Sequence, residues 1–211
     1  MKVLITLGPT QEPIDDVRFI TNASSGRMGA ALAEEALKRG HKVIIVAGPV
    51  NINLPKKARV VHVRTAAEMT DKTLKLLEGQ GILISTAAIA DYTPDKKISG
   101  KIKSGGNMVL KLKRTRKLIK EARKRFPDLF IVGFKAEYGV RKKQLAATAK
   151  RKLIESRLDL IVANDLSKGI FDSDETEAFI IEAKNVREVG RTSKAAAAGR
   201  IWDAVESKLN P

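Results

Sequence analysis

Short runs of β-forming apolar residues alternate with amphipathic segments along most of this chain. The run at 81–89 is apolar on both faces, which predicts a central strand. Alternation at this spacing predicts an α/β fold, a Rossmann-like doubly wound parallel sheet in a single domain over residues 1–211. The predicted strands are 3–7, 43–47, 59–64, 81–89, 129–134 and 159–164, and the predicted helices are 28–40, 65–78, a segment around Leu118 to Ala122, 141–157 and 193–209.

Two segments depart from this alternation. Residues from about 176 to 190 predict an antiparallel hairpin that turns at Lys184-Asn185. Residues from about 92 to 113, inserted after the fourth strand, predict a β-hairpin flap that turns at Gly105-Gly106-Asn107.

The predicted flap carries cations along one face, because Lys101 and Lys103 are two residues apart, as are Lys111 and Lys113. Lysines of this kind have two interpretations. They can keep an exposed sheet edge from aggregating, or they can close over the phosphates of a ligand.

Gly26 and Gly29 stand between a polar loop and the first predicted helix, after the first predicted strand. A glycine at a helix entrance lets the backbone approach a ligand, and the free amides there favour an anion. Asn22, Ser24 and Ser25 add further hydrogen-bond donors. Two glycines alone also fit a loop that only packs, so this motif needs its context.

The context is the carboxyl end of the predicted sheet, where open α/β sheets bind their ligands. Small or polar residues end the strands there, and with the glycine loop and the flap they predict a nucleotide-sized site. A dinucleotide fold should have an acidic residue after the second strand, for the ribose. Residues 47–50 are Ala-Gly-Pro-Val, which argues against a nicotinamide dehydrogenase.

Composition limits the remaining classes. Lys and Arg number 40 against 24 acidic residues, a net charge of +16, but they are spread over all helical segments and aromatic residues are only 4%. The charge therefore suits a small anionic ligand or a heat-adapted surface better than nucleic acid. The absence of Cys excludes a thiol nucleophile. The presence of only two His residues disfavours a His-rich metal site. No apolar run is long enough for a membrane span and no signal peptide is recognisable, so the expected location is the cytoplasm.

Seven motifs, in order, make the chain resemble the phosphopantothenoylcysteine synthetase family, the phosphopantothenate–cysteine ligases of coenzyme A biosynthesis. The resemblance covers nearly the whole chain. One departure is visible, because members often have Thr/Asn-Pro-Asp where this chain has Thr115-Arg116-Lys117. The motifs are Gly8–Asp15, Val17–Gly29, Ala87–Tyr92, Lys101–Lys103, Val132–Phe134, Asp159–Asp165 and Phe171–Asp174.

The resemblance implies a reaction in two steps. The carboxylate of 4′-phosphopantothenate attacks the α-phosphate of a nucleoside triphosphate, which gives an acyl nucleotidylate and pyrophosphate. The amine of L-cysteine then displaces the nucleoside monophosphate to form an amide. CTP is expected in preference to ATP, with Mg²⁺ as the metal. No enzyme nucleophile is needed, in agreement with the lack of Cys.

The resemblance also implies roles for individual residues and partners. Asn22 would hold the acyl-phosphate intermediate, and Lys101 would neutralise charge at the α-phosphate. Arg18 would reach the substrate phosphate of a neighbouring subunit, because family members are homodimers. A flavin-dependent decarboxylase, to which this domain is often fused, is the expected pathway partner. Ala87 and Ala88 would shape the pocket that holds the acyl-phosphate intermediate, and Asp91 would contact the ribose or Mg²⁺. The residues implied to bind the nucleotide are Ser24, Gly26, Gly29, Lys103, Phe134 and Asn164.

Simpler interpretations stand beside these roles. Asn22 could make only a local backbone hydrogen bond, and Mg²⁺ can be held mainly by phosphates rather than Asp91. Four further acidic residues are interpreted as turn or capping residues: Asp15, Asp16, Asp172 and Asp174. A short-chain type reductase would need a Tyr-x-x-x-Lys pair on a helix. Tyr92 and Tyr138 each have a lysine four residues later, but neither tyrosine lies in a predicted helix.

Overall fold

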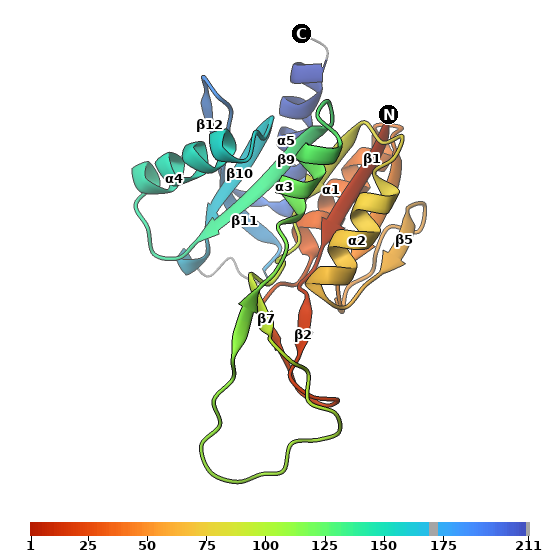
Figure 1. The fold of residues 1–211 in the computed structure, drawn as a ribbon. Helices are drawn as coiled ribbons and strands as arrows, with labels where there is room; N and C mark the ends of the chain where they lie inside the picture. Colours follow the sequence, from red (N-terminus) through yellow and green to blue (C-terminus); the bar gives the residue numbers. More distant parts are fainter. Residues whose placement is uncertain (169–172, 210–211) are drawn as a thin grey trace.

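The computed structural model describes residues 1–168 and 173–209. A central sheet of eight strands is covered by helices on both faces (Figure 1). Six neighbouring strands are parallel, and the last two are antiparallel. In spatial order the strands are β5 (Arg59–His62), β4 (Lys42–Ala47), β1 (Lys2–Leu7), β6 (Ile82–Ser85), β9 (Phe130–Glu137), β10 (Leu160–Asp165), β11 (Glu175–Ile181) and β12 (Val186–Ser193). The doubly wound sheet and the C-terminal hairpin are thus confirmed.

The direction of winding reverses between β1 and β6. The chain leaves β1 for β4 and β5 on one side, then returns to β6, β9 and β10 on the other. The connections after β1 and β6 therefore lead to helices on opposite faces of the sheet, although residues 8–10 remain hydrogen-bonded to Ala88 just beyond the strand ends. Such a switch point is where open α/β sheets bind their ligands. Within the sheet β6 pairs with β1 and β9 and all its residues are buried, as predicted for a central strand.

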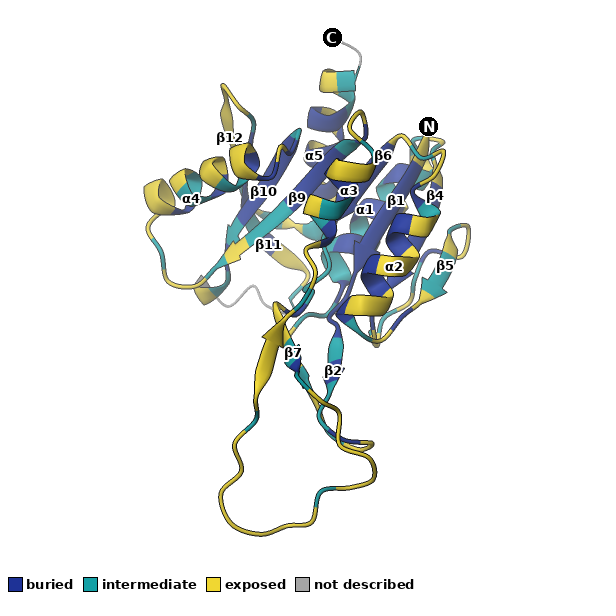
Figure 2. Ribbon diagram, in the orientation of Figure 1, coloured by how far each residue is buried: buried dark blue, intermediate teal, exposed yellow. Residues whose placement is uncertain are grey.

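Within the described ranges, two α-helices cover one face of the sheet and three cover the other. Trp202 is fully buried, and its Nε1 donates to Leu32 O over 2.9 Å, which ties α5 to α1. Figure 2 shows the buried sheet between the partly exposed helices. The first face carries α1 (Arg27–Lys38) and α5 (Lys194–Leu209), and the second carries α2 (Ala66–Leu76), α3 (Leu118–Arg125) and α4 (Lys142–Glu155). No described helix is both long and apolar enough to span a membrane.

Thr65 caps α2 as its sequence predicts, because its side chain accepts a hydrogen bond from Glu68 N over 3.1 Å. The Glu68 carboxylate turns back one residue further than a capping box requires and accepts from Arg64 N over 2.7 Å. Both amides at this helix start are satisfied.

The predicted flap is a hairpin only at its base. There β7 (Tyr92–Pro94) pairs with β8 (Leu112–Arg114), whereas residues 95–111 contain no strand. The predicted β-hairpin flap is thus confirmed at its base, whereas the strand periodicity predicted to place Lys101 and Lys103 on one face was wrong, because neither residue lies in a strand. Glycines and closely spaced like charges in this stretch disfavour a regular ladder.

A second small hairpin lies beside the flap and was not predicted. It pairs β2 (Gln11–Pro13) with β3 (Phe19–Thr21). Both hairpins extend beyond the end of the sheet where β1 finishes (Figure 1). We call them together the arm, residues 11–21 and 92–114. A short 3₁₀ turn, η1 (Leu166–Lys168), follows β10.

Candidate functional site

A cavity of about 490 Å³ lies at the carboxyl ends of the parallel strands, between the start of α1 on one side and Lys117 and Lys152 of the α3 and α4 side on the other. Its wall includes the 23–26 loop, the first turn of α1, the 86–91 loop and the ends of β9 and β10. Eight of the residues predicted from the sequence line this one cavity: Ser24, Gly26, Gly29, Ala87, Ala88, Asp91, Phe134 and Asn164.

The start of α1 faces this cavity. Gly26 is the N-cap residue with φ 76°, a left-handed conformation that a glycine adopts without strain, and no side chain caps the helix. A Cβ on Gly26 would lie 2.8 Å from Val50 Cγ1. The first turn contains no acidic residue. Its backbone amides and the helix dipole therefore favour an anion at this wall.

Gly29 lets α1 approach the sheet closely, as predicted. A Cβ at this position would lie 2.5 Å from Leu7 Cβ and 2.6 Å from Thr86 Oγ1. Gly29 thus sets how near the amides of the first turn lie to the carboxyl ends of β1 and β6.

Asn22 does not line the cavity but borders it. Its Nδ2 donates to Ala88 O over 3.2 Å, a contact across 66 positions of sequence. Thr10 N donates to the same carbonyl over 3.3 Å. The hydrogen bond of Asn22 is therefore not the local one of the simpler interpretation, and it joins two predicted substrate residues.

Asp91 is the one acidic side chain among the described residues that line the cavity. It forms an ion pair with Lys117, the N-cap residue of α3. Lys117 belongs to the segment that departs from the family pattern, so this departure places a cation at the cavity. In the described ranges, no three His, Cys, Asp or Glu residues are grouped as a metal site. A single carboxylate still fits Mg²⁺ that is held mainly by phosphates.

Five basic residues line the cavity, namely Arg27, Lys117, Lys135, Lys152 and Lys194. Burial lowers the pKa of Lys152, and the neighbouring ammonium groups of Lys117 and Lys120 lower it further. An anion here would offset both effects. Sequence reasoning missed Lys152 because nothing marks it among 40 Lys and Arg residues. Only the packing of α4 places it here.

Three predicted residues lie away from the cavity wall, on the arm. Lys101 and Lys103 are exposed in the flap. Arg18 binds the Asp15 carboxylate of its own chain, with Nη2 to Oδ2 2.6 Å and Nε to Oδ2 2.9 Å. Its reach to a neighbouring subunit stays a prediction.

The four acidic residues that were interpreted from the sequence as turn or capping residues have different surroundings. Asp15 accepts from Val17 N, as a turn residue does, over 2.9 Å. Asp16 contacts the flap. Asp174 forms an ion pair with Arg27 at 3.1 Å. Phe171 and Asp172 lie outside the described residues.

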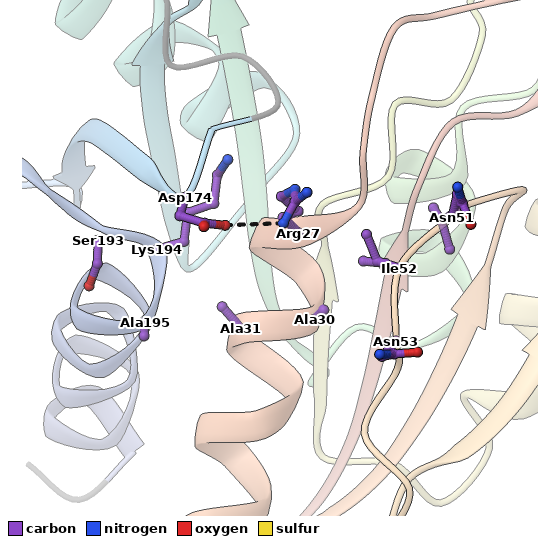
Figure 3. A pocket seen from close by; sticks show the side chains of 11 residues that line it. Arg27, Ala30, Ala31, Asn51, Ile52, Asn53, Asp174, Ser193, Lys194 and Ala195 are labelled. Carbon is purple, nitrogen blue, oxygen red and sulfur yellow. Dashed lines mark hydrogen bonds and ion pairs between the residues drawn. The ribbon is translucent and has the colours of Figure 1, made fainter.

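A second, larger cavity of about 810 Å³ lies on the outer side of α1. Figure 3 shows Arg27 pointing toward Asp174 between the starts of α1 and α5, with Asn51 and Asn53 on the opposite wall. Arg27 lines both cavities, whereas no residue predicted to bind substrate or nucleotide lines the larger one. The smaller cavity is therefore the candidate site.

The reductase alternative finds no support at this site. Tyr92 lies in β7, and Tyr138 follows β9 with 78% of its surface exposed. Val50, in the segment where a dinucleotide fold carries its ribose carboxylate, packs near the Gly26 turn instead.

Known proteins resemble this chain in sequence and in fold. Residues 1–209 match the family model described as the DNA/pantothenate metabolism flavoprotein C-terminal domain. The coenzyme A biosynthesis bifunctional protein CoaBC of Methanocaldococcus jannaschii is 41% identical over 193 residues, which are 92% of this chain and 47% of that protein. The chain thus spans about half the length of the curated relatives it matches.

Solved structures show the same fold. The DNA/pantothenate metabolism flavoprotein from Streptococcus pneumoniae superimposes with a TM-score of 0.88 at 26% identity, over 99% of each chain. The C-terminal domain of a CoaBC protein superimposes with a TM-score of 0.83 at 31% identity, over 99% of this chain and 95% of that chain.

Proposed function

Because the chain belongs to the family of the DNA/pantothenate metabolism flavoprotein C-terminal domain, we propose that it is a phosphopantothenate–cysteine ligase. It would join 4′-phosphopantothenate to L-cysteine through an acyl nucleotidylate. The observation that carries the proposal is the cavity at the switch point, which the start of α1, five basic side chains and one carboxylate of the described residues line together. Such a wall suits a nucleoside triphosphate and its developing charge.

In the first step, the amides of the 26–29 turn and the cations of the wall would hold the triphosphate. The carboxylate of phosphopantothenate would then attack the α-phosphate, and pyrophosphate would leave. Lys152 and Lys117 would stabilise the added negative charge. Lys101 would approach from the flap and neutralise the α-phosphate as the bond forms. Mg²⁺, held by the phosphates and Asp91, would supply further charge neutralisation.

In the second step, the cysteine amine would attack the acyl carbon, lose its proton and displace the nucleoside monophosphate. Asn22, fixed by Ala88 O, would hold the acyl phosphate in place for this attack. Catalysis by positioning and fixed donors is sufficient here, because neither step needs a covalent enzyme intermediate.

The finer assignments belong to the same proposal. We expect CTP to be preferred over ATP, and a homodimer in solution. Exposed apolar residues on the arm, Val17, Phe19 and Val109, support a partner subunit there. A flavin-dependent decarboxylase would act beside it in the pathway. Sedimentation velocity tests the dimer, and a monomer would refute that part alone.

The activity test is incubation with phosphopantothenate and each triphosphate, with and without cysteine. We expect pyrophosphate without cysteine, and amide with nucleoside monophosphate when cysteine is added. Absence of pyrophosphate with every triphosphate would refute the ligase. Steeply salt-dependent binding to DNA or RNA would instead favour the nucleic-acid alternative.

The flap test compares Lys101→Gln with the control Lys111→Gln, which changes another exposed flap lysine. We expect pyrophosphate release to fall roughly a hundredfold in Lys101→Gln and to stay unchanged in the control. Bound nucleotide should also protect the wild-type flap from proteolysis between Lys97 and Lys113. Wild-type activity of Lys101→Gln, with equal cleavage in both states, would leave the flap lysines as edge protection only.

A further inference from the structure

The residue before Lys101 is bound to the tip of the β2–β3 hairpin. Gly100 N donates to Asp16 Oδ2 over 2.6 Å, and Gly100 O accepts from Asp16 N over 3.1 Å. Asp16 also forms an ion pair with Lys97 at 2.5 Å. Both backbone polar groups of Gly100 are thus paired with one residue.

The residue after Lys101 is bound to the same turn. Ile102 N donates to Asp15 Oδ2 over 3.1 Å, and Ile102 O accepts from Arg18 Nη2 over 2.8 Å. The Asp15 side chain is fully buried. Arg18 holds the pKa of Asp15 well below its usual range, so the carboxylate stays charged at neutral pH.

The β2–β3 hairpin is in turn fixed to the body of the protein. Gln11 N donates to Arg64 O over 2.8 Å. Glu12, which is 2% exposed, accepts from Ala66 N at the start of α2 over 2.8 Å. Asn22 directly follows this hairpin and is bound to Ala88 O. One short element therefore connects Asn22 with the backbone on both sides of Lys101.

We propose that Asp15 and Asp16 are positioning residues for Lys101, holding the flap backbone where its ammonium group serves the reaction. This inference rests on the proposed function, in which Lys101 acts at the α-phosphate. The contacts order this part of a strandless loop before substrate arrives, so the loop's ordering entropy is not lost in each turnover.

The test uses Asp16→Ala, because Asp16 is half-exposed and its loss should not unfold the protein. The control is Asp95→Ala, which removes a flap carboxylate paired with Lys111 and Lys113 instead. We expect kcat for pyrophosphate release to fall about tenfold in Asp16→Ala, with KM for the triphosphate within about twofold of wild type. Asp16→Asn keeps an acceptor for Gly100 N and should retain more activity than Asp16→Ala. The control should match wild type.

A double-mutant cycle separates positioning from a general structural effect. If Asp16 acts through Lys101, adding Asp16→Ala to Lys101→Gln should lower kcat no further. Multiplicative losses would overturn the proposal, and so would full activity of either single variant.

Tryptic cleavage after Lys101 without ligand gives a readout that does not depend on the reaction. Faster cleavage in Asp16→Ala than in Asp95→Ala is expected, and equal rates would overturn the proposal. A wild-type protein that makes no amide product would instead refute the proposed function, while this cleavage assay still reports on the attachment.

Discussion

Gly29→Ala should weaken both the fold and the anion site, because the new methyl group has no space. It would lie 2.5 Å from Leu7 Cβ and 2.6 Å from Thr86 Oγ1. The threonine hydroxyl can rotate away only by losing its hydrogen bond to Thr6 O at 2.8 Å, and Leu7 Cβ cannot move because it is bonded directly to the backbone of β1. Either α1 must move off the sheet, or the strand must shift.

The change in the free energy of unfolding for Gly29→Ala follows from two opposing effects. Overpacking a tightly packed position costs about 1–3 kcal/mol. Replacing Gly by Ala within a helix gains at most about 1 kcal/mol. Since the closest atom is fixed to a central strand, we expect net destabilisation of about 1–2 kcal/mol, or roughly 2–8 °C in Tm for a chain of this size.

The matched control is Gly199→Ala in α5, where an added Cβ meets no atom within 4 Å. That variant should be more stable than wild type by up to about 1 kcal/mol. Urea unfolding gives both free energies, and calorimetric titration with triphosphate should show weaker binding for Gly29→Ala only. A Gly29→Ala protein as stable as Gly199→Ala would refute the close-packing argument.

Asn22→Asp should abolish amide formation in a folded protein, because it replaces N–H donors worth roughly 3–4 kcal/mol with a negative charge near an anionic intermediate; unchanged product formation would contradict this role. Lys152→Gln should weaken triphosphate binding about tenfold, since it removes a cation from the wall, and equal affinity by titration calorimetry would count against an anion there. The folded-state pKa of Asp15 lies below its ordinary value of 3.8, so its stabilising effect is complete above that pH and is lost as pH falls through the lowered pKa. The stability difference between wild type and Asp15→Asn in urea should therefore be constant from about pH 5 to 8 and shrink below about pH 4; a difference that grows in acid would reverse the argument.

The order of strands and helices could be predicted from the sequence, because period and capping are local properties of the chain. Apolar runs predicted β1, β4, β6, β9 and β10, and Gly26 with Gly29 predicted a glycine turn that opens a closely packed helix. Both glycines do line the cavity. Motif order then indicated which loop ends would meet at the carboxyl edge of the sheet.

Tertiary structure alone decided which side chains and hairpins from other parts of the chain lie close to those loop ends. Lys152 reaches the cavity only because the buried face of α4 packs against the sheet, and no local pattern separates it from other lysines. The β2–β3 hairpin is too short for a recognisable period. The flap has no ladder beyond its base, and its backbone on either side of Lys101 is held by Asp15, Asp16 and Arg18, more than 80 positions away in sequence. Contacts of that separation depend on how the completed fold brings two loops together, and residue types alone do not encode them locally.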